Sequence, residues 1–204
     1  MSGRSTTGNL PVLEGRRYGQ APGSADEEDR VAIGRLVDGQ VDVHYGQIYV
    51  HSDPSSPGSE LPESFAGQSG GLCGAAVPGA LLLMTGLHTG KVGFTVEVLD
   101  QAPALDPEWE DVVEVSFRPR SDSSELVEFL QQNAWTLDLA EVDYRVRYCA
   151  RGMDAGREAD TRVDDEPPVD CYLLQFWPAP AEPDRVVRQT SDAAAYWHEY
   201  ARGL

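Results

Sequence analysis

Short segments in which apolar and polar residues alternate run along most of the chain. Every second residue is apolar or aromatic in segments 92–98, 113–117 and 142–148. Because strand side chains point alternately to opposite faces, each segment can bury one face and expose the other. Helical spacing is confined to 124–132 and 191–204. Many short strands without alternating helices predict a mainly β protein, an antiparallel β-sandwich of seven or eight strands with a C-terminal helix.

Further strands follow from the same reasoning. Residues 41–50 alternate with a one-residue slip, which predicts a strand bent by a bulge at Gly46. Residues 80–84 and 92–98 predict two strands joined by a hairpin connection at 85–90, and 135–139 a further strand. Residues 171–177 are apolar on both faces and predict an interior strand. The side chains expected to point inward are Val43, Phe94, Val96, Val115, Phe117, Leu137, Tyr144, Val146, Leu173 and Phe176.

The 204 residues predict one domain with appendages. Residues 1–30 are rich in glycine and acidic residues, lack apolar periodicity and are expected to be disordered. The sandwich domain spans 31–190, with a surface loop at 51–71 that is dense in Ser, Pro and Gly. Residues 191–204 form a helix that docks on the domain through Ala193, Trp197, Tyr200 and Leu204.

Charge excludes several classes of partner. The chain carries 34 acidic and 16 basic residues, a net charge of −18, so nucleic acids and anionic membranes should repel it. The longest apolar stretch, around 80–84, is far short of the ~20 residues that a membrane helix needs. The start of the sequence shows no signal-peptide pattern, and we expect a cytoplasmic protein.

The candidate reactive groups are a glycine-rich segment, Gly67–Gly74, with Cys73 and a histidine, His88. A thiolate next to an imidazole would suit a hydrolase or a small-ligand site, which is the alternative hypothesis. The segment lacks phosphate-loop spacing, and three widely spaced cysteines predict reduced, mostly buried thiols. Histidine and carboxylate spacings match no metal motif, so neither a metal nor another cofactor is expected.

Negative charge is concentrated in residues 97–143, which hold thirteen acidic and two basic residues, a net charge of −11. A compact acidic group with one large aromatic side chain precedes the strand at 112–117. This surface predicts a docking face for a basic protein, with the tryptophan as a possible anchor. A soluble surface with a tryptophan in the core is the competing interpretation. The candidate partner-binding residues are Asp106, Glu108, Trp109, Glu110 and Asp111.

Several blocks of the sequence, in order, resemble the competence protein J family. They are Val43–Val50, Gly79–Leu81 through Thr89–Lys91 and Val96–Val98, Trp109–Phe117, Trp135–Leu139 leading to Asp143–Tyr148, and Cys171–Trp177. The similarity covers roughly residues 40–178. Members of that family are small, acidic, cytoplasmic β proteins, and the member that gives the family its name inhibits a DNA-entry nuclease by forming a complex with it. The resemblance therefore implies a non-enzymatic, acidic binding protein. Together with the charge, the resemblance predicts a binding protein for a basic partner such as a nuclease or toxin.

Overall fold

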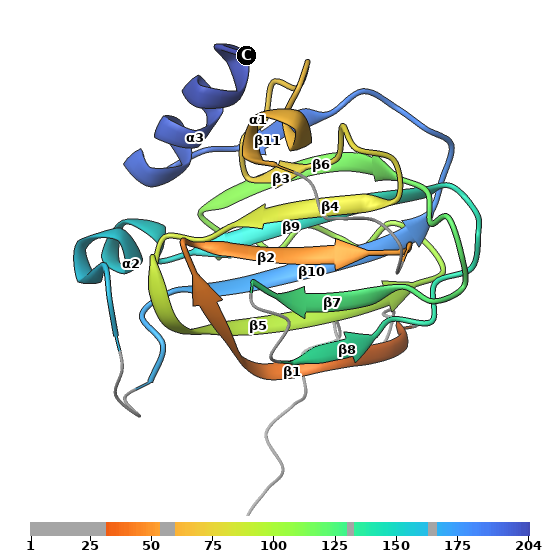
Figure 1. The fold of residues 1–204 in the computed structure, drawn as a ribbon, viewed down its shortest axis with the longest axis horizontal. Helices are drawn as coiled ribbons and strands as arrows, with labels where there is room; N and C mark the ends of the chain where they lie inside the picture. The colour runs from red at the N-terminus through yellow and green to blue at the C-terminus, as the bar shows by residue number, and fades with distance from the viewer. Residues whose placement is uncertain (1–31, 54–59, 130–132, 163–166) are drawn as a thin grey trace, which may run out of the picture.

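The computed structural model describes residues 32–53, 60–129, 133–162 and 167–204 (Figure 1). The predicted disordered segment, residues 1–30, lies outside these residues. The strands are β1 (Ala32–His44), β2 (Gln47–His51), β3 (Cys73–Gly74), β4 (Ala80–Met84), β5 (Thr89–Leu99), β6 (Asp111–Phe117), β7 (Glu125–Glu128), β8 (Ala134–Thr136), β9 (Tyr144–Arg151), β10 (Cys171–Pro178) and β11 (Arg185–Arg188). The helices are α1 (Leu61–Ser64), α2 (Met153–Ala159) and α3 (Asp192–Arg202).

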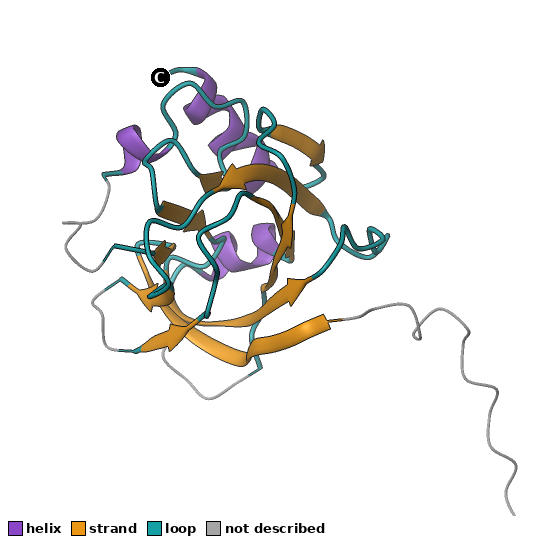
Figure 2. Ribbon diagram, turned by 90° about the vertical axis from the view of Figure 1, so that its right-hand side faces the viewer, coloured by secondary structure: helices purple, strands orange, loops and turns teal. Residues whose placement is uncertain are grey.

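All described strands belong to one curled, mixed sheet, and the predicted antiparallel sandwich is wrong. The strand order is β11-β6-β9-β10-β5-β1-β2-β4-β3, with β7 paired to β2 and β8 paired to β7. β10 runs parallel to β5 and antiparallel to β9. The curl, visible in Figure 2, brings β3, at one end of this order, into contact with β6 near the other end (Figure 1). Closing one sheet on itself buries an interior without a second sheet.

The chain turns sharply at Tyr45 and Gly46, where the sequence predicted a bulge. Both residues have positive φ, 57° and 64°, and His44 pairs directly with Gln47. Two consecutive residues with positive φ form the type I′ turn of a two-residue β-hairpin. The slip in the alternation therefore marks the change from β1 to β2.

Four other predicted segments differ from the structure. Residues 125–128 of the predicted helix 124–132 form strand β7, and 130–132 lie outside the described residues. The connection at 85–90 is not a hairpin, because β4 pairs with β2 and β3 while β5 pairs with β1 and β10. The predicted strand at 135–139 is reduced to β8, which ends at Thr136. The predicted loop at 51–71 contains α1, and its residues 54–59 lie outside the description.

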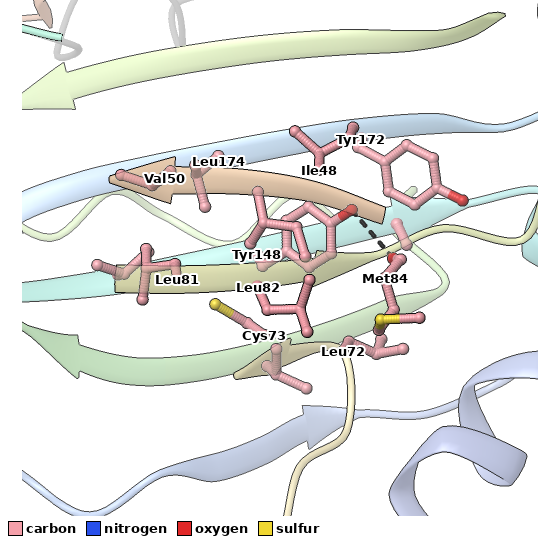
Figure 3. Close-up of a cluster of buried hydrophobic side chains, with 14 of the residues drawn as sticks. Ile48, Val50, Leu72, Cys73, Leu81, Leu82, Met84, Tyr148, Tyr172 and Leu174 are labelled. Carbon is pink, nitrogen blue, oxygen red and sulfur yellow. Dashed lines mark hydrogen bonds between the residues drawn. The ribbon is translucent and has the colours of Figure 1, made fainter. Parts of the chain in front are cut away.

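The core lies on the concave face, and all ten residues predicted to point inward are buried. Nine of them belong to the main cluster, whereas Leu173 packs on the opposite face with Val112 and Cys149. Figure 3 shows side chains of β2, β3, β4, β9 and β10 pointing toward one another, with the Tyr148 hydroxyl donating to the Met84 carbonyl. β10 is buried along most of its length, as the prediction of an interior strand requires.

The C-terminal helix forms as predicted, and three of the four residues expected to dock it contact the core: Ala193 is buried, and Trp197 and Tyr200 pack partly buried against the main cluster. Its buried residues are Ala193, Ala194, His198 and Ala201, whereas Leu204 is exposed. Gly71 allows this approach, because a Cβ atom there would overlap the Trp197 carbonyl. Small residues on the helix and a glycine beneath it let the backbones come close, which leaves the large aromatic rings at the margin.

Candidate functional site

The predicted acidic segment is an ordered loop before β6. The Arg188 guanidinium donates to the carbonyl oxygens of Asp106, Pro107 and Trp109, at 3.5, 3.0 and 2.6 Å. The Arg151 guanidinium lies 5.7 Å from the centre of the Trp109 ring and pairs with the Glu108 carboxylate at 3.5 Å. These contacts hold the loop against β9 and β11, and the Glu108 side chain points outward with 77% exposure.

The carboxylates of Glu110 and Asp111 accept hydrogen bonds from other segments of the same chain. Glu110 accepts the Gly152 backbone N–H at 2.8 Å, immediately before α2. Asp111 is completely buried, and its carboxylate accepts the backbone N–H groups of Thr190 and Ser191 and the Ser191 hydroxyl. A partner could not reach the Asp111 carboxylate without local unfolding. The prediction of a docking surface is therefore retained for Asp106, Glu108, Trp109 and Glu110, while Asp111 positions α3.

The count of acidic residues overstated the acidic surface. Four of the thirteen acids in residues 97–143 are buried: Glu97, Asp111, Glu114 and Glu128. Glu128 accepts the Asp42 backbone N–H and the Asn133 side-chain amide. Buried carboxylates need such partners, because an unpaired charge in the interior is costly. About a third of the apparent negative surface is therefore internal structure.

A polar row crosses the convex face of the sheet, at right angles to the strands. Its members are directly opposed cross-strand pairs, and four contacts between neighbours have lengths of 2.6–3.2 Å. Arg185 and Arg147 donate to Glu114, and Gln175 and Arg35 donate to Glu97. In strand order the row is Arg185, Glu114, Arg147, Gln175, Glu97 and Arg35.

Glu114 is the centre of this row. It is 1% exposed and accepts from three guanidinium groups, because Arg145 also donates to it at 3.2 Å. Burial alone would raise the pKa of the Glu114 carboxyl, but the hydrogen bonds and charges of the three arginines outweigh burial and hold that pKa below its ordinary value. The carboxylate is therefore ionised and fixed, which makes it a structural group.

The glycine-rich segment is also committed to internal contacts. The backbone N–H groups of Ser69 and Gly70 donate to the Asp184 carboxylate, and that of Gly71 donates to Nδ1 of His198. A phosphate cradle needs such N–H groups to face a ligand. Here a carboxylate and an imidazole of the same chain occupy three consecutive donors.

Cys73 lies in the core with its neighbours of β4 and β9 (Figure 3). Burial raises the pKa of the Cys73 thiol, which is the opposite of the shift that a nucleophilic thiolate requires. His88 is exposed, and its ring contacts Thr89 and Tyr45. The structure therefore gives the alternative hypothesis no thiolate and imidazole pair. Among the described residues, no cluster of three or more His, Cys, Asp or Glu side chains could hold a metal ion.

A further site, which we call the aromatic pocket, opens between four parts of the chain: the β1–β2 turn, the segment after β4, α2 and α3. The sequence did not predict it. Its volume is about 230 Å³. Tyr45 packs edge-on against His88, and the Arg157 guanidinium lies 5.2 Å from the centre of the Tyr196 ring. The side chains that define the pocket are Tyr45, His88, Arg157, Asp160, Tyr196 and Trp197.

The acidic loop and the aromatic pocket are parts of one assembly. Glu110 holds the residue before α2, and Asp111 holds the residues before α3. Asp154 of α2 accepts the Asp192 and Ala193 backbone N–H groups at the start of α3. These contacts fix the two helices whose side chains line the pocket. The only sequence signal for the pocket was Tyr45-Gly46 between two alternating segments. Two residues that include a glycine, placed between two such segments, are typical of a β-hairpin turn.

These features define a class of protein: a small β protein in which one curled mixed sheet surrounds the core and a C-terminal helix packs against it. The crystal structure of ComJ from Bacillus subtilis, an inhibitor of the DNA degrading activity of NucA, matches with a TM-score of 0.51 and 14% sequence identity. The match covers 72% of this chain and 98% of ComJ. The chain therefore has a ComJ-like fold, as the resemblance in sequence predicted.

A second solved structure, of crocagin biosynthetic gene J, matches with a TM-score of 0.45 and 17% identity over 70% of this chain and 97% of that one. No protein-family model matches the sequence, and no curated protein matches it. None of the described helices has the length and apolar character needed to cross a membrane.

Proposed function

We propose that this chain is a non-enzymatic binding protein that associates with a basic partner protein, with a nuclease or toxin as the first expectation, and inhibits it. The observation that carries the proposal is the acidic loop held in place by Arg188. Arg188 fixes its backbone through three carbonyl oxygens while Glu108 projects into solvent. A binding element that is already ordered loses little conformational entropy when a partner docks.

Charge and fold both support this proposal. The net charge of −18 favours encounter with a basic protein, because complementary potentials speed association. The ComJ structure has the same fold and is described as an inhibitor of NucA. In this model Asp106, Glu108 and Glu110 steer the partner, and the Trp109 ring contributes apolar contact.

The test is the association rate of a captured partner with the full chain at several salt concentrations. Glu108→Lys should slow association and weaken its dependence on salt, because steering follows the local potential. The matched control is Asp122→Lys, which makes the same charge change at another exposed acidic residue. An association rate that changes neither in Glu108→Lys nor with added salt would contradict the proposal. Catalytic inhibition is then measured directly on the captured partner.

A further inference from the structure

Backbone strain marks the aromatic pocket. Tyr45 has φ of 57°, although the positions of a type I′ turn favour Asn, Asp or Gly. Asp160 has φ of 55° and ψ of −65°, and the Thr161 N–H donates to the Ala159 carbonyl across it, which is a strained γ-turn. These are two of the three described non-glycine residues with positive φ. Such strain persists where the surrounding structure enforces it, and it concentrates at functional sites.

Exposed aromatic surface gathers at the same place. Tyr45 is 60% exposed and Tyr196 is 52% exposed, and both line the pocket. A neighbouring hollow, lined by Tyr196, Tyr200 and Leu204 among others, continues this surface along the last turns of α3. Tyrosine, tryptophan and arginine are the residues that contribute most often to binding energy at protein interfaces. All three types are present here.

The size and chemistry of the pocket select the occupant. A volume of about 230 Å³ lies below the ~300–1,000 Å³ typical of small-molecule pockets, and it suits one protein side chain. Aromatic rings line it, and rings pair favourably edge-to-face. The Arg157 guanidinium already lies over the Tyr196 ring and would repel a second cation inside the pocket.

The charge around the pocket selects the kind of partner. Helices α2 and α3 together with Asp160 carry five acidic and two basic residues, all exposed, a net charge of −3. Basic residues that flank an inserted ring would therefore meet complementary charge at the rim. We propose that the aromatic pocket is the anchor point of the partner interface and receives one exposed aromatic side chain of a basic protein. This inference rests on the proposed function and adds its contact site.

The test uses defined tripeptides with blocked ends, so that it does not depend on the partner's identity. The probes are Lys-Trp-Lys, Lys-Ala-Lys, Lys-Arg-Lys and Glu-Trp-Glu, titrated into the full chain while amide and indole signals are followed by NMR. Four tryptophans provide internal references. Lys-Trp-Lys should shift the Trp197 indole and the Gly46 amide in a saturable way, and bind at least several-fold more tightly than the other three.

Tyr45→Asn separates binding from folding. Asn tolerates positive φ, so the turn and the stability should be retained, whereas the ring is lost. The affinity for Lys-Trp-Lys should fall roughly threefold to tenfold, in line with the loss of one aromatic pair. The matched control is Val142→Ala, which removes another exposed apolar side chain and should leave the affinity unchanged.

The outcomes distinguish this inference from the proposed function. Equal binding of Lys-Arg-Lys or Glu-Trp-Glu, shifts at Trp109 in place of Trp197, no saturable shift, or wild-type affinity in Tyr45→Asn would each overturn it. Glu108→Lys should leave tripeptide affinity unchanged while it slows association of a captured partner. If only the tripeptides fail, the pocket assignment is wrong and the binding function stands. If the association rate of the partner does not depend on charge while Lys-Trp-Lys still binds, the pocket is a binding site for an aromatic side chain and the proposed electrostatic docking is wrong.

Discussion

The carboxylate of Asp111 lies 2.6 Å from the hydroxyl of Ser191, across 80 positions of sequence. Ser191 is the N-cap of α3, and its hydroxyl oxygen in turn accepts the Ala194 backbone N–H. The first residue of β6 is thereby bonded to the first turn of the C-terminal helix. A residue that the sequence placed on a docking surface instead joins the helix to the sheet.

Removal of this link should loosen α3. Asp111→Ala is expected to cost ~1.5–3 kcal/mol in the free energy of unfolding, because it removes charge-assisted hydrogen bonds from buried donors. Ser191→Ala should cost about 1 kcal/mol through the lost cap. Urea unfolding of both single variants and the double variant measures the coupling. Additive losses would show that the two groups act independently, contrary to the contact described.

Glu114 should be among the most sensitive single positions. Glu114→Gln is expected to cost ~3–5 kcal/mol, because it leaves the buried guanidinium groups of Arg145 and Arg147 without their counter-charge. The matched control is Glu108→Gln, which removes an exposed ion pair and should cost at most ~1 kcal/mol. Equal losses in the two variants, measured by chemical unfolding, would refute the structural role of Glu114.

The lowered pKa of Glu114 predicts how the free energy of unfolding changes in acid. The folded-state pKa of Glu114 lies below the ordinary value of 4.5, so its contribution is fully present above pH 4.5 and is lost as the pH falls through the lower folded value. In Glu114→Gln this part of the acid dependence should be absent. Unfolding midpoints between pH 5 and pH 3, compared in the two proteins, provide the measurement.

His198 should make the protein less stable below neutral pH. Burial, followed by the charge of Arg202, lowers the pKa of the His198 imidazole, and Asp111 opposes this shift. Its Nδ1 accepts the Gly71 N–H, so the neutral ring carries its proton on Nε2. The unfolded chain binds a proton near pH 6.5 and the folded chain does not, so stability falls as the pH drops below about 6.5.

A variant isolates this effect. In His198→Gln the loss of stability between pH 7.5 and pH 5.5 should be smaller than in the wild type. Burial also lowers the pKa of the His51 imidazole, which therefore adds a loss of the same sign in both proteins. Identical pH profiles for the wild type and the variant would contradict the prediction.

Thiol reactivity tests the alternative hypothesis. Burial raises the pKa of Cys149 to about 12 and raises that of Cys73 as well, so both thiols should be inert toward Ellman's reagent in the folded protein at neutral pH. Cys171 is partly exposed and should account for the fast phase, which Cys171→Ser would remove. Cys73→Ala should leave partner binding unchanged. Rapid modification of Cys73 would restore it as a candidate nucleophile.

The alternation of apolar residues predicted the inner face well, because it depends only on neighbouring positions in one strand. Phe94, Val115 and Tyr144 are buried as expected. The arrangement of the strands depends on contacts far apart in sequence, such as the parallel pairing of Leu174 with Val96. The sandwich prediction failed there, since a curled single sheet and two packed sheets require the same alternation.

The sequence overstated the acidic surface and missed the aromatic pocket for related reasons. A net charge per segment does not reveal which carboxylates are internal, and Glu97 and Glu114 point to arginine and glutamine partners on neighbouring strands. The aromatic pocket joins residues near positions 45, 88, 157–160 and 196–197, which no local pattern connects. At 124–132, apolar residues with helical spacing were interpreted as a helix, although Leu126 and Val127 are both buried in a strand.

The position of β10 in the sheet has a consequence for the growing chain on the ribosome. β10 lies between β5 and β9, and its residues are translated more than 70 positions after β5. Until Cys171–Pro178 emerges, the nascent polypeptide presents two open strand edges, on β5 and on β9. Such edges pair readily with other chains. Synthesis that stalls before this strand should therefore yield aggregates, and refolding of the full-length chain should be slow because its central pairing is non-local.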